Sequence, residues 1–175
     1  MFYGEEMAKI VRDLFDVMYG GWTDEDLLMR PQELRHFTSV VNTKVGRNLN
    51  SNAICKFLMG ARKDGDNPFG KKRVNYTPIL ELELKASEVK LSVDEFEEVV
   101  AKVFLRDNPP SEAERLQRDC DRAMEFCRSV RQAIGFVESI LITDTMILRA
   151  LTRSRKAGRF RESTNSTDVR SSGEA

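Results

Sequence analysis

The sequence is poor in the residues that build metal centres, disulfide frameworks and membrane spans. Its 175 residues include three cysteines and one histidine. An odd number of cysteines argues against a disulfide framework, and a single histidine leaves few metal ligands. No run of about 18 apolar residues is present, so we expect no membrane span. Residues 1–6 lack the basic region and apolar core of a signal peptide. We therefore expect a cytoplasmic protein without bound metal or cofactor.

An excess of charge of one sign is also missing from the chain as a whole. There are 28 basic and 28 acidic residues, so the formal net charge is zero. This balance conceals alternating blocks. Residues 1–36 carry 4 basic and 8 acidic side chains, residues 37–75 carry 8 and 2, residues 76–120 carry 6 and 11, and residues 121–175 carry 10 and 7. Blocks of opposite sign favour binding to an anion or to another protein.

Two stretches of the chain share a pattern of apolar residues, which predicts a mainly α-helical fold with an internal duplication. A shift of 89 residues superposes apolar residues at helical spacing, and after an insertion of four residues the shift becomes 93. The superposed pairs include Met7 and Phe96, Val11 and Val100, Phe15 and Phe104, Phe37 and Phe126, Gly46 and Gly135, Ile54 and Ile147, and Leu58 and Leu151. Both stretches end in Arg-Lys-x-Gly, at Arg62 and at Arg155. A coincidental likeness between amphipathic helices is the alternative.

Helix-start and helix-stop signals divide each stretch into several helices. Thr23 with Asp26 and Ser92 with Glu95 have the spacing of capping boxes, as does Ser111 with Glu114. Gly46 and Gly135 stand where helices are expected to end. We expect a helical repeat in residues 1–66, a basic loop with a β insertion in 67–91, a second helical repeat in 92–160 and a disordered tail in 161–175.

The β insertion is predicted from residues 79–85, which alternate between apolar and charged side chains. This period of two is typical of a strand, with Leu80, Leu82 and Leu84 on its buried face. A helix with Pro78 in its first turn is the alternative.

Catalytic motifs are weak throughout. Residues 65–71 match G-x-x-x-x-G-K, but Lys72 stands where a phosphate-binding loop needs Ser or Thr, and a helix rather than a strand precedes it. Cys55, Cys120 and Cys127 are expected to be small buried residues. His36 has no ligand at a suitable spacing. We therefore find no catalytic constellation and identify no small-molecule substrate, and we expect a protein that is not an enzyme. An enzyme of unrecognised type is the alternative.

The basic residues are the most informative feature for function. Residues 149–161 carry six basic side chains and no acidic one, with a stripe along one helix face. The candidate residues for contact with nucleic acid or another anion are Arg149, Arg153, Lys156, Arg159, Arg161, Lys71, Lys72, Arg73, Lys56 and Lys63. A basic helix that follows another helix across a short turn has the outline of a helix-turn-helix reader of DNA.

Two functions fit this charge pattern. One is non-catalytic binding of nucleic acid through the basic last helix of each repeat. The other is a protein–protein adaptor or a self-assembling module, in which acidic faces around Glu95, Glu97 and Glu98 dock basic ones. Basic residues near a helix C-terminus also have an ordinary structural role, because they can pair with a carboxylate of a neighbouring helix. We therefore expect the partner to be nucleic acid, another protein or a second copy of this chain. We expect no binding to a membrane.

Overall fold

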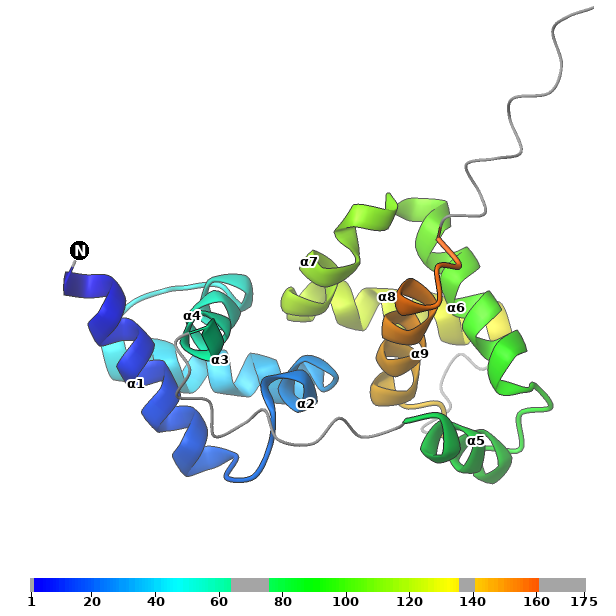
Figure 1. Cartoon of the computed structure of the whole chain (residues 1–175), viewed down its shortest axis with the longest axis horizontal. Coiled ribbons are helices and arrows are strands. Elements are labelled where there is room, and N and C mark those ends of the chain that lie inside the picture. The colour runs from blue at the N-terminus through cyan, green and yellow to red at the C-terminus, as the bar shows by residue number, and fades with distance from the viewer. Residues whose placement is uncertain (1, 64–75, 136–140, 161–175) are drawn as a thin grey trace, which may run out of the picture.

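A computed structural model describes residues 2–63, 76–135 and 141–160, and within these residues the chain is helical with no strand (Figure 1). The elements are α1 (Phe2–Met18), α2 (Asp24–Leu28), α3 (Pro31–Val45), α4 (Ser51–Lys63), α5 (Tyr76–Ala86), α6 (Val93–Asp107), a 3-10 turn (Pro110–Glu112), α7 (Ala113–Arg118), α8 (Cys120–Ile134) and α9 (Asp144–Lys156). The prediction of a mainly α-helical fold is confirmed. None of the described helices is both long and apolar enough to cross a membrane.

Most helix ends follow from local sequence chemistry. The side chains of Thr23 and Ser92 each accept a hydrogen bond from the backbone N–H of the residue three positions later. The acidic side chains at those positions, Asp26 and Glu95, accept a hydrogen bond from the backbone N–H of Thr23 and Ser92, so both arrangements are capping boxes. Gly46 and Gly135 end α3 and α8 with φ angles of 62° and 91°, a left-handed conformation that glycine adopts without strain. The capping box predicted at Ser111 is wrong, because a 3-10 turn over Pro110–Glu112 precedes α7 instead.

The described residues form two helical halves, the N-terminal half of α1–α4 and the C-terminal half of α5–α9 (Figure 1). Each half has its own apolar core, centred on Phe15 and Phe37 in one and on Phe104 and Phe126 in the other. In each core the two phenylalanines meet edge to face, at ring-centroid distances of 5.8 Å and 6.0 Å. This geometry is favourable for aromatic pairs.

Helix bounds and helix contacts recur between the halves. α3 and α8 both have 15 residues, 89 positions apart, and α4 and α9 both have 13 residues, 93 positions apart. α1 packs against α3 and α4 as α6 packs against α8 and α9. This recurrence does not establish the predicted internal duplication, which stays a prediction. The predicted repeat boundaries likewise stay predictions.

The predicted strand at residues 79–85 is wrong, because α5 is a helix that begins with Pro78 in its first turn. Leu80 and Leu84 are buried at 0% and 3% exposure, whereas Leu82 is 67% exposed. Two residues four apart lie on one face of a helix as well as of a strand, so the alternating leucines fit both. Leucine, glutamate and lysine are strong helix formers, and they decide the outcome here.

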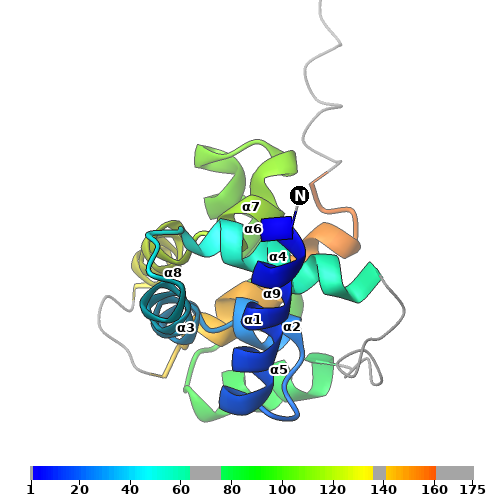
Figure 2. The same ribbon diagram turned by 90° about the vertical axis from the view of Figure 1, so that its left-hand side faces the viewer.

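The halves meet along a seam where α3 packs against α8 and α4 packs against α7. Figure 2 shows α3 and α8 side by side, with α1 toward the viewer. Ser51 bridges the seam: its hydroxyl donates to the Arg118 carbonyl at 2.7 Å and accepts from the Cys120 N–H at 3.2 Å. Cys120 and Met29 each pack into the core of the opposite half. The halves are therefore joined by both polar and apolar contacts.

Candidate interaction surfaces

The basic stripe predicted on α9 begins with Arg149, which is only 9% exposed. Its guanidinium donates to the Glu83 carboxylate at 3.2 Å. Because Glu83 belongs to α5, this ion pair lies where α5 packs against α9. Arg149 is thus part of a helix–helix contact within the chain.

Two further arginines of the predicted surface converge on Glu97, a residue of α6 that is 1% exposed. The Arg153 Nε donates to one of its carboxylate oxygens, and an Arg159 nitrogen lies 3.3 Å from the other. Arg159 also donates to Asp94 at 2.9 Å. The Ser154 hydroxyl donates to the Glu97 backbone carbonyl at 3.1 Å. A buried carboxylate requires such partners, so these cations stabilise the α6–α9 contact.

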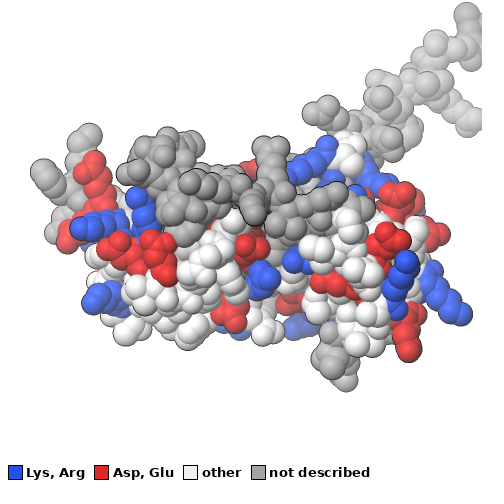
Figure 3. Space-filling view, turned by 60° about the horizontal axis from the view of Figure 1, so that its bottom comes forward, with Lys and Arg blue, Asp and Glu red and all other residues white. Residues whose placement is uncertain are grey.

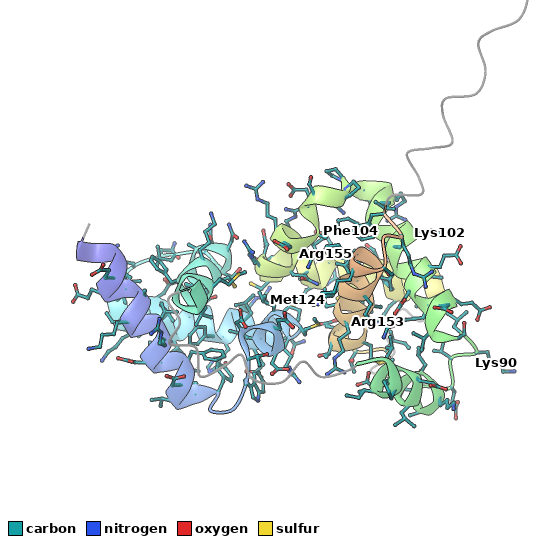
Figure 4. All side chains as sticks on the ribbon, in the orientation of Figure 1. Lys90, Lys102, Phe104, Met124, Arg153 and Arg155 are labelled. Atoms are coloured by element: carbon teal, nitrogen blue, oxygen red, sulfur yellow. The ribbon has the colours of Figure 1, made fainter. Side chains whose placement is uncertain are left out.

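Arg155 lies on another side of α9 and pairs with Glu114 of α7. The two neighbouring arginines, both labelled in Figure 4, therefore pair with different helices, Arg155 with α7 and Arg153 with α6. On the face drawn in Figure 3, basic and acidic side chains of the described residues are interspersed. The cationic field of α9 is therefore largely compensated by neighbouring carboxylates.

The remaining predicted residues are placed differently. Lys156 and Lys56 are exposed, on α9 and α4 respectively. Lys71, Lys72, Arg73, Arg161 and the side chain of Lys63 lie outside the described residues. The structure therefore does not bring all ten candidates to one described surface. Sequence reasoning missed Glu83, Glu97 and Glu114 as specific partners, and helical spacing carries no signal for pairings between distant helices.

The three cysteines are free and buried, as the sequence predicts. Burial raises the pKa of the Cys55 thiol to about 12, and burial with the nearby Asp144 raises the pKa of Cys127 well above its usual value. Such thiols stay protonated at neutral pH and are poor nucleophiles and metal ligands. In the described part of the chain, no three His, Cys, Asp or Glu residues gather in a way that could hold a metal ion.

A small hollow of about 120 Å³ lies on the seam between α2, α7 and α9. Leu28, Met29 and Met59 contribute apolar surface to it, and Arg155, paired with Glu114, lines its edge. A volume of this size is well below the roughly 300 Å³ of the smaller ligand pockets. The hollow is therefore too small for a typical small-molecule ligand.

Helices α1 and α4 of the N-terminal half pack against each other. On these helices Ala8, Arg12, Ala53 and Phe57 are half-buried, and Lys56 is exposed. The Nε atom of Arg12 is buried and has no hydrogen-bond partner among the described residues.

Comparison of the chain with protein families, with curated proteins and with solved structures finds no match.

Proposed function

We propose that this chain is a non-catalytic binding protein that engages a protein partner. One observation carries the proposal: the described arginines of the most basic segment, residues 149–160, lie in ion pairs within the chain. Arg149 pairs with Glu83, Arg153 and Arg159 with Glu97, and Arg155 with Glu114. Side chains held in this way support folding of the C-terminal half and offer little charge to an external anion.

Nucleic-acid binding is the second proposal, and it has less support. Contact with phosphates requires lysine and arginine side chains that are available to pair with the nucleic acid. To bind phosphate, the arginines of α9 would first have to break their ion pairs with carboxylates of neighbouring helices. One of these carboxylates, that of Glu97, is buried. Binding would then depend on exposed lysines such as Lys56 and Lys156, or on Lys71, Lys72 and Arg73 outside the described residues.

Binding to labelled duplex and single-stranded DNA and RNA, at about 50 and about 200 mM salt, separates these two proposals. We expect no binding at either salt concentration. Tight binding at low salt that weakens steeply at high salt would overturn the protein-partner proposal. A variant with Lys71, Lys72 and Arg73 all changed to Glu is the control, because it should abolish any nucleic-acid binding through that segment.

A capture experiment from nuclease-treated extract tests the positive side of the proposal. The full chain, immobilised through a terminal tag, should retain the same protein at high and low salt after nuclease treatment. A partner that is lost when nucleic acid is digested would show that the association is indirect. Light scattering on the purified chain would show self-assembly as a mass above 20.0 kDa.

A further inference from the structure

A shallow hollow of about 600 Å³ lies on the N-terminal half, along α3 and the turn between α3 and α4. We call it the α3 hollow. Its lining residues include Arg35, Thr38, Asn42, Thr43, Arg47 and Asn48. None of the described residues that line it is acidic, although the chain has as many acidic as basic residues. The α3 hollow is therefore a polar surface with positive charge.

The part of the chain that forms the hollow lacks acidic side chains over a long stretch. Residues 34–63 contain six lysines and arginines and no aspartate or glutamate. Residues 1–33, by contrast, carry eight acidic and three basic side chains. The positive charge of residues 34–63 is thus not compensated by a carboxylate of the same stretch, which favours an acidic partner.

The two arginines of the hollow, Arg35 and Arg47, are exposed. Arg35 forms an ion pair with Asp121 of α8, and the two side chains are 60% and 76% exposed. An ion pair with so much exposure contributes at most about 1 kcal/mol, so Arg35 can exchange Asp121 for an external carboxylate at little cost. Arg153 of α9 differs, because its partner Glu97 is buried.

Two threonine hydroxyls of the hollow can accept hydrogen bonds from a partner. The Thr38 hydroxyl donates to the Leu34 carbonyl at 2.7 Å. The Thr43 hydroxyl donates to the Ser39 carbonyl at 3.0 Å. Each proton is thus used within the helix, while each hydroxyl oxygen can still accept. The backbone N–H groups of a peptide can donate to these oxygens, whereas phosphates only accept, so the hydroxyls favour a peptide over a phosphate backbone.

The turn that carries Arg47 is held in place before any partner binds. The Asn42 amide donates to the Leu49 carbonyl and accepts from the Leu49 N–H, both at 2.8 Å. Gly46 ends α3 with a φ angle of 62°, the left-handed conformation that glycine adopts without strain. A turn that is already fixed lowers the entropy cost of binding.

We infer that the α3 hollow docks an extended acidic segment of a partner protein. The carboxylates of this segment pair with Arg35 and Arg47. Its backbone N–H groups donate to Thr38 and Thr43. The helix rises about 15 Å between positions 35 and 45, a distance that an extended chain covers in about five residues, so the paired acidic residues stand about five positions apart. This inference rests on the proposed binding of a protein partner, and it names the site and the chemistry.

A second copy of this chain is a poor source of the segment. The acidic residues at positions 1–33 lie in α1, α2 and the first turn of α3, so they are helical rather than extended. Light scattering should therefore give a mass near 20.0 kDa for the purified chain. A dimer that an acidic peptide dissociates would assign the hollow to self-assembly and overturn the inference.

A labelled octapeptide of alternating glutamate and serine is the probe, because it spans about 26 Å when extended and places its carboxylates on one side. We expect saturable binding to the full chain in fluorescence anisotropy at about 150 mM salt. The matched peptide has glutamine in place of glutamate. It keeps the N–H groups without the charge and should bind at least about tenfold more weakly. An oligothymidylate of eight nucleotides should not bind.

Charge changes locate the peptide on the protein. Arg47→Glu should weaken binding of the acidic peptide about tenfold or more. Arg35→Gln removes the other cation without repelling Asp121 and should weaken binding about threefold or more. The matched control is Lys56→Glu, at an exposed lysine of α4 that does not line the hollow, which should change the affinity less than about twofold. Circular dichroism checks that each variant keeps its helices.

Three kinds of result would overturn the inference. One is no saturable binding of the acidic peptide at millimolar protein concentration. Another is equal binding of the glutamine peptide, or binding that Arg47→Glu leaves unchanged, because either excludes carboxylate recognition in the hollow. The third is tighter binding of the oligothymidylate than of the acidic peptide, lost in Arg47→Glu, which would assign the hollow to nucleic acid.

The failure of this inference can be told apart from the failure of the proposed function. If a nuclease-resistant protein partner is still captured from extract, the proposed function stands and only the site is lost. A captured partner that Arg47→Glu retains as well as the unchanged chain does would place the interface elsewhere on the molecule.

Discussion

The two halves share a helix order and a phenylalanine pair, yet they treat charge differently. In the C-terminal half, Arg149 and Glu97 are both buried. Arg149 forms an ion pair with Glu83, and Glu97 forms one with Arg153. In the N-terminal half, the corresponding residues are an exposed Lys56 and a half-buried Ala8. In the C-terminal half α5 contributes the ion pair between Glu83 and Arg149, while the ion pairs of Glu97 join α6 to α9 and the turn after it. Among the described residues, no helix of the N-terminal half takes the place that α5 has in the C-terminal half.

The largest expected effect concerns the phenylalanine pair that the halves share. Phe15→Ala and Phe104→Ala remove fully buried rings, so each should lower the free energy of unfolding by about 3–5 kcal/mol. Urea denaturation measures both. Val17→Ala, at a residue that is 83% exposed, should change it by less than about 0.5 kcal/mol. A small loss for only one phenylalanine would contradict the equivalence of the two cores.

The buried carboxylate that distinguishes the C-terminal half comes next. Glu97→Ala leaves Arg153 and Arg159 without their shared acceptor, and we expect a loss of about 3 kcal/mol. Thermal unfolding provides the measurement. The neighbouring Glu98 is exposed and pairs with Lys102, so Glu98→Ala should cost less than about 1 kcal/mol. Equal losses for the two variants would mean that Glu97 is not buried among cations.

A smaller effect tests how firmly the halves are joined. Ser51→Ala removes a hydroxyl that bonds to both Arg118 and Cys120 across the seam, so we expect a loss of about 1–2 kcal/mol. If the seam couples the halves, the variant should still unfold in one transition followed by fluorescence and circular dichroism together. Ser39→Ala, at an exposed position on α3, is the matched control. Identical stability of both variants would show that the seam contact is dispensable.

The smallest expected effect concerns an exposed residue of α5, a helix with no described counterpart in the N-terminal half. Leu82→Asp replaces an exposed side chain of α5 and should shift the free energy of unfolding by less than about 0.5 kcal/mol. Leu80→Asp would place a charge in the core and should prevent stable packing of α5. A strand with both leucines on its buried face would make the two variants equally damaging, so calorimetry on the pair decides between helix and strand.

Much of the fold was predictable because its signals are local. The capping boxes at Thr23 and Ser92 and the glycine ends at Gly46 and Gly135 need only residues a few positions apart. The alternation of apolar and charged residues led to a wrong prediction of a strand at α5, because leucines at i and i+4 lie on one face of a strand and of a helix alike. The partners of the basic residues were less predictable. A basic stripe in the sequence shows where positive charge lies along one helix, but it does not show which other helix packs against that stripe.

By itself, the sequence determined where most helices begin and end and which phenylalanines occupy the two cores. These features depend on hydrogen bonds within one helical turn and on apolar spacing along one helix. Only the tertiary structure decided that Arg149 meets Glu83 and that Arg153 meets Glu97, pairs separated by 66 and 56 positions. Such contacts depend on how helices dock, so four of the basic residues that suggest an exposed anion-binding surface in the sequence lie in ion pairs within the fold: Arg149, Arg153, Arg155 and Arg159.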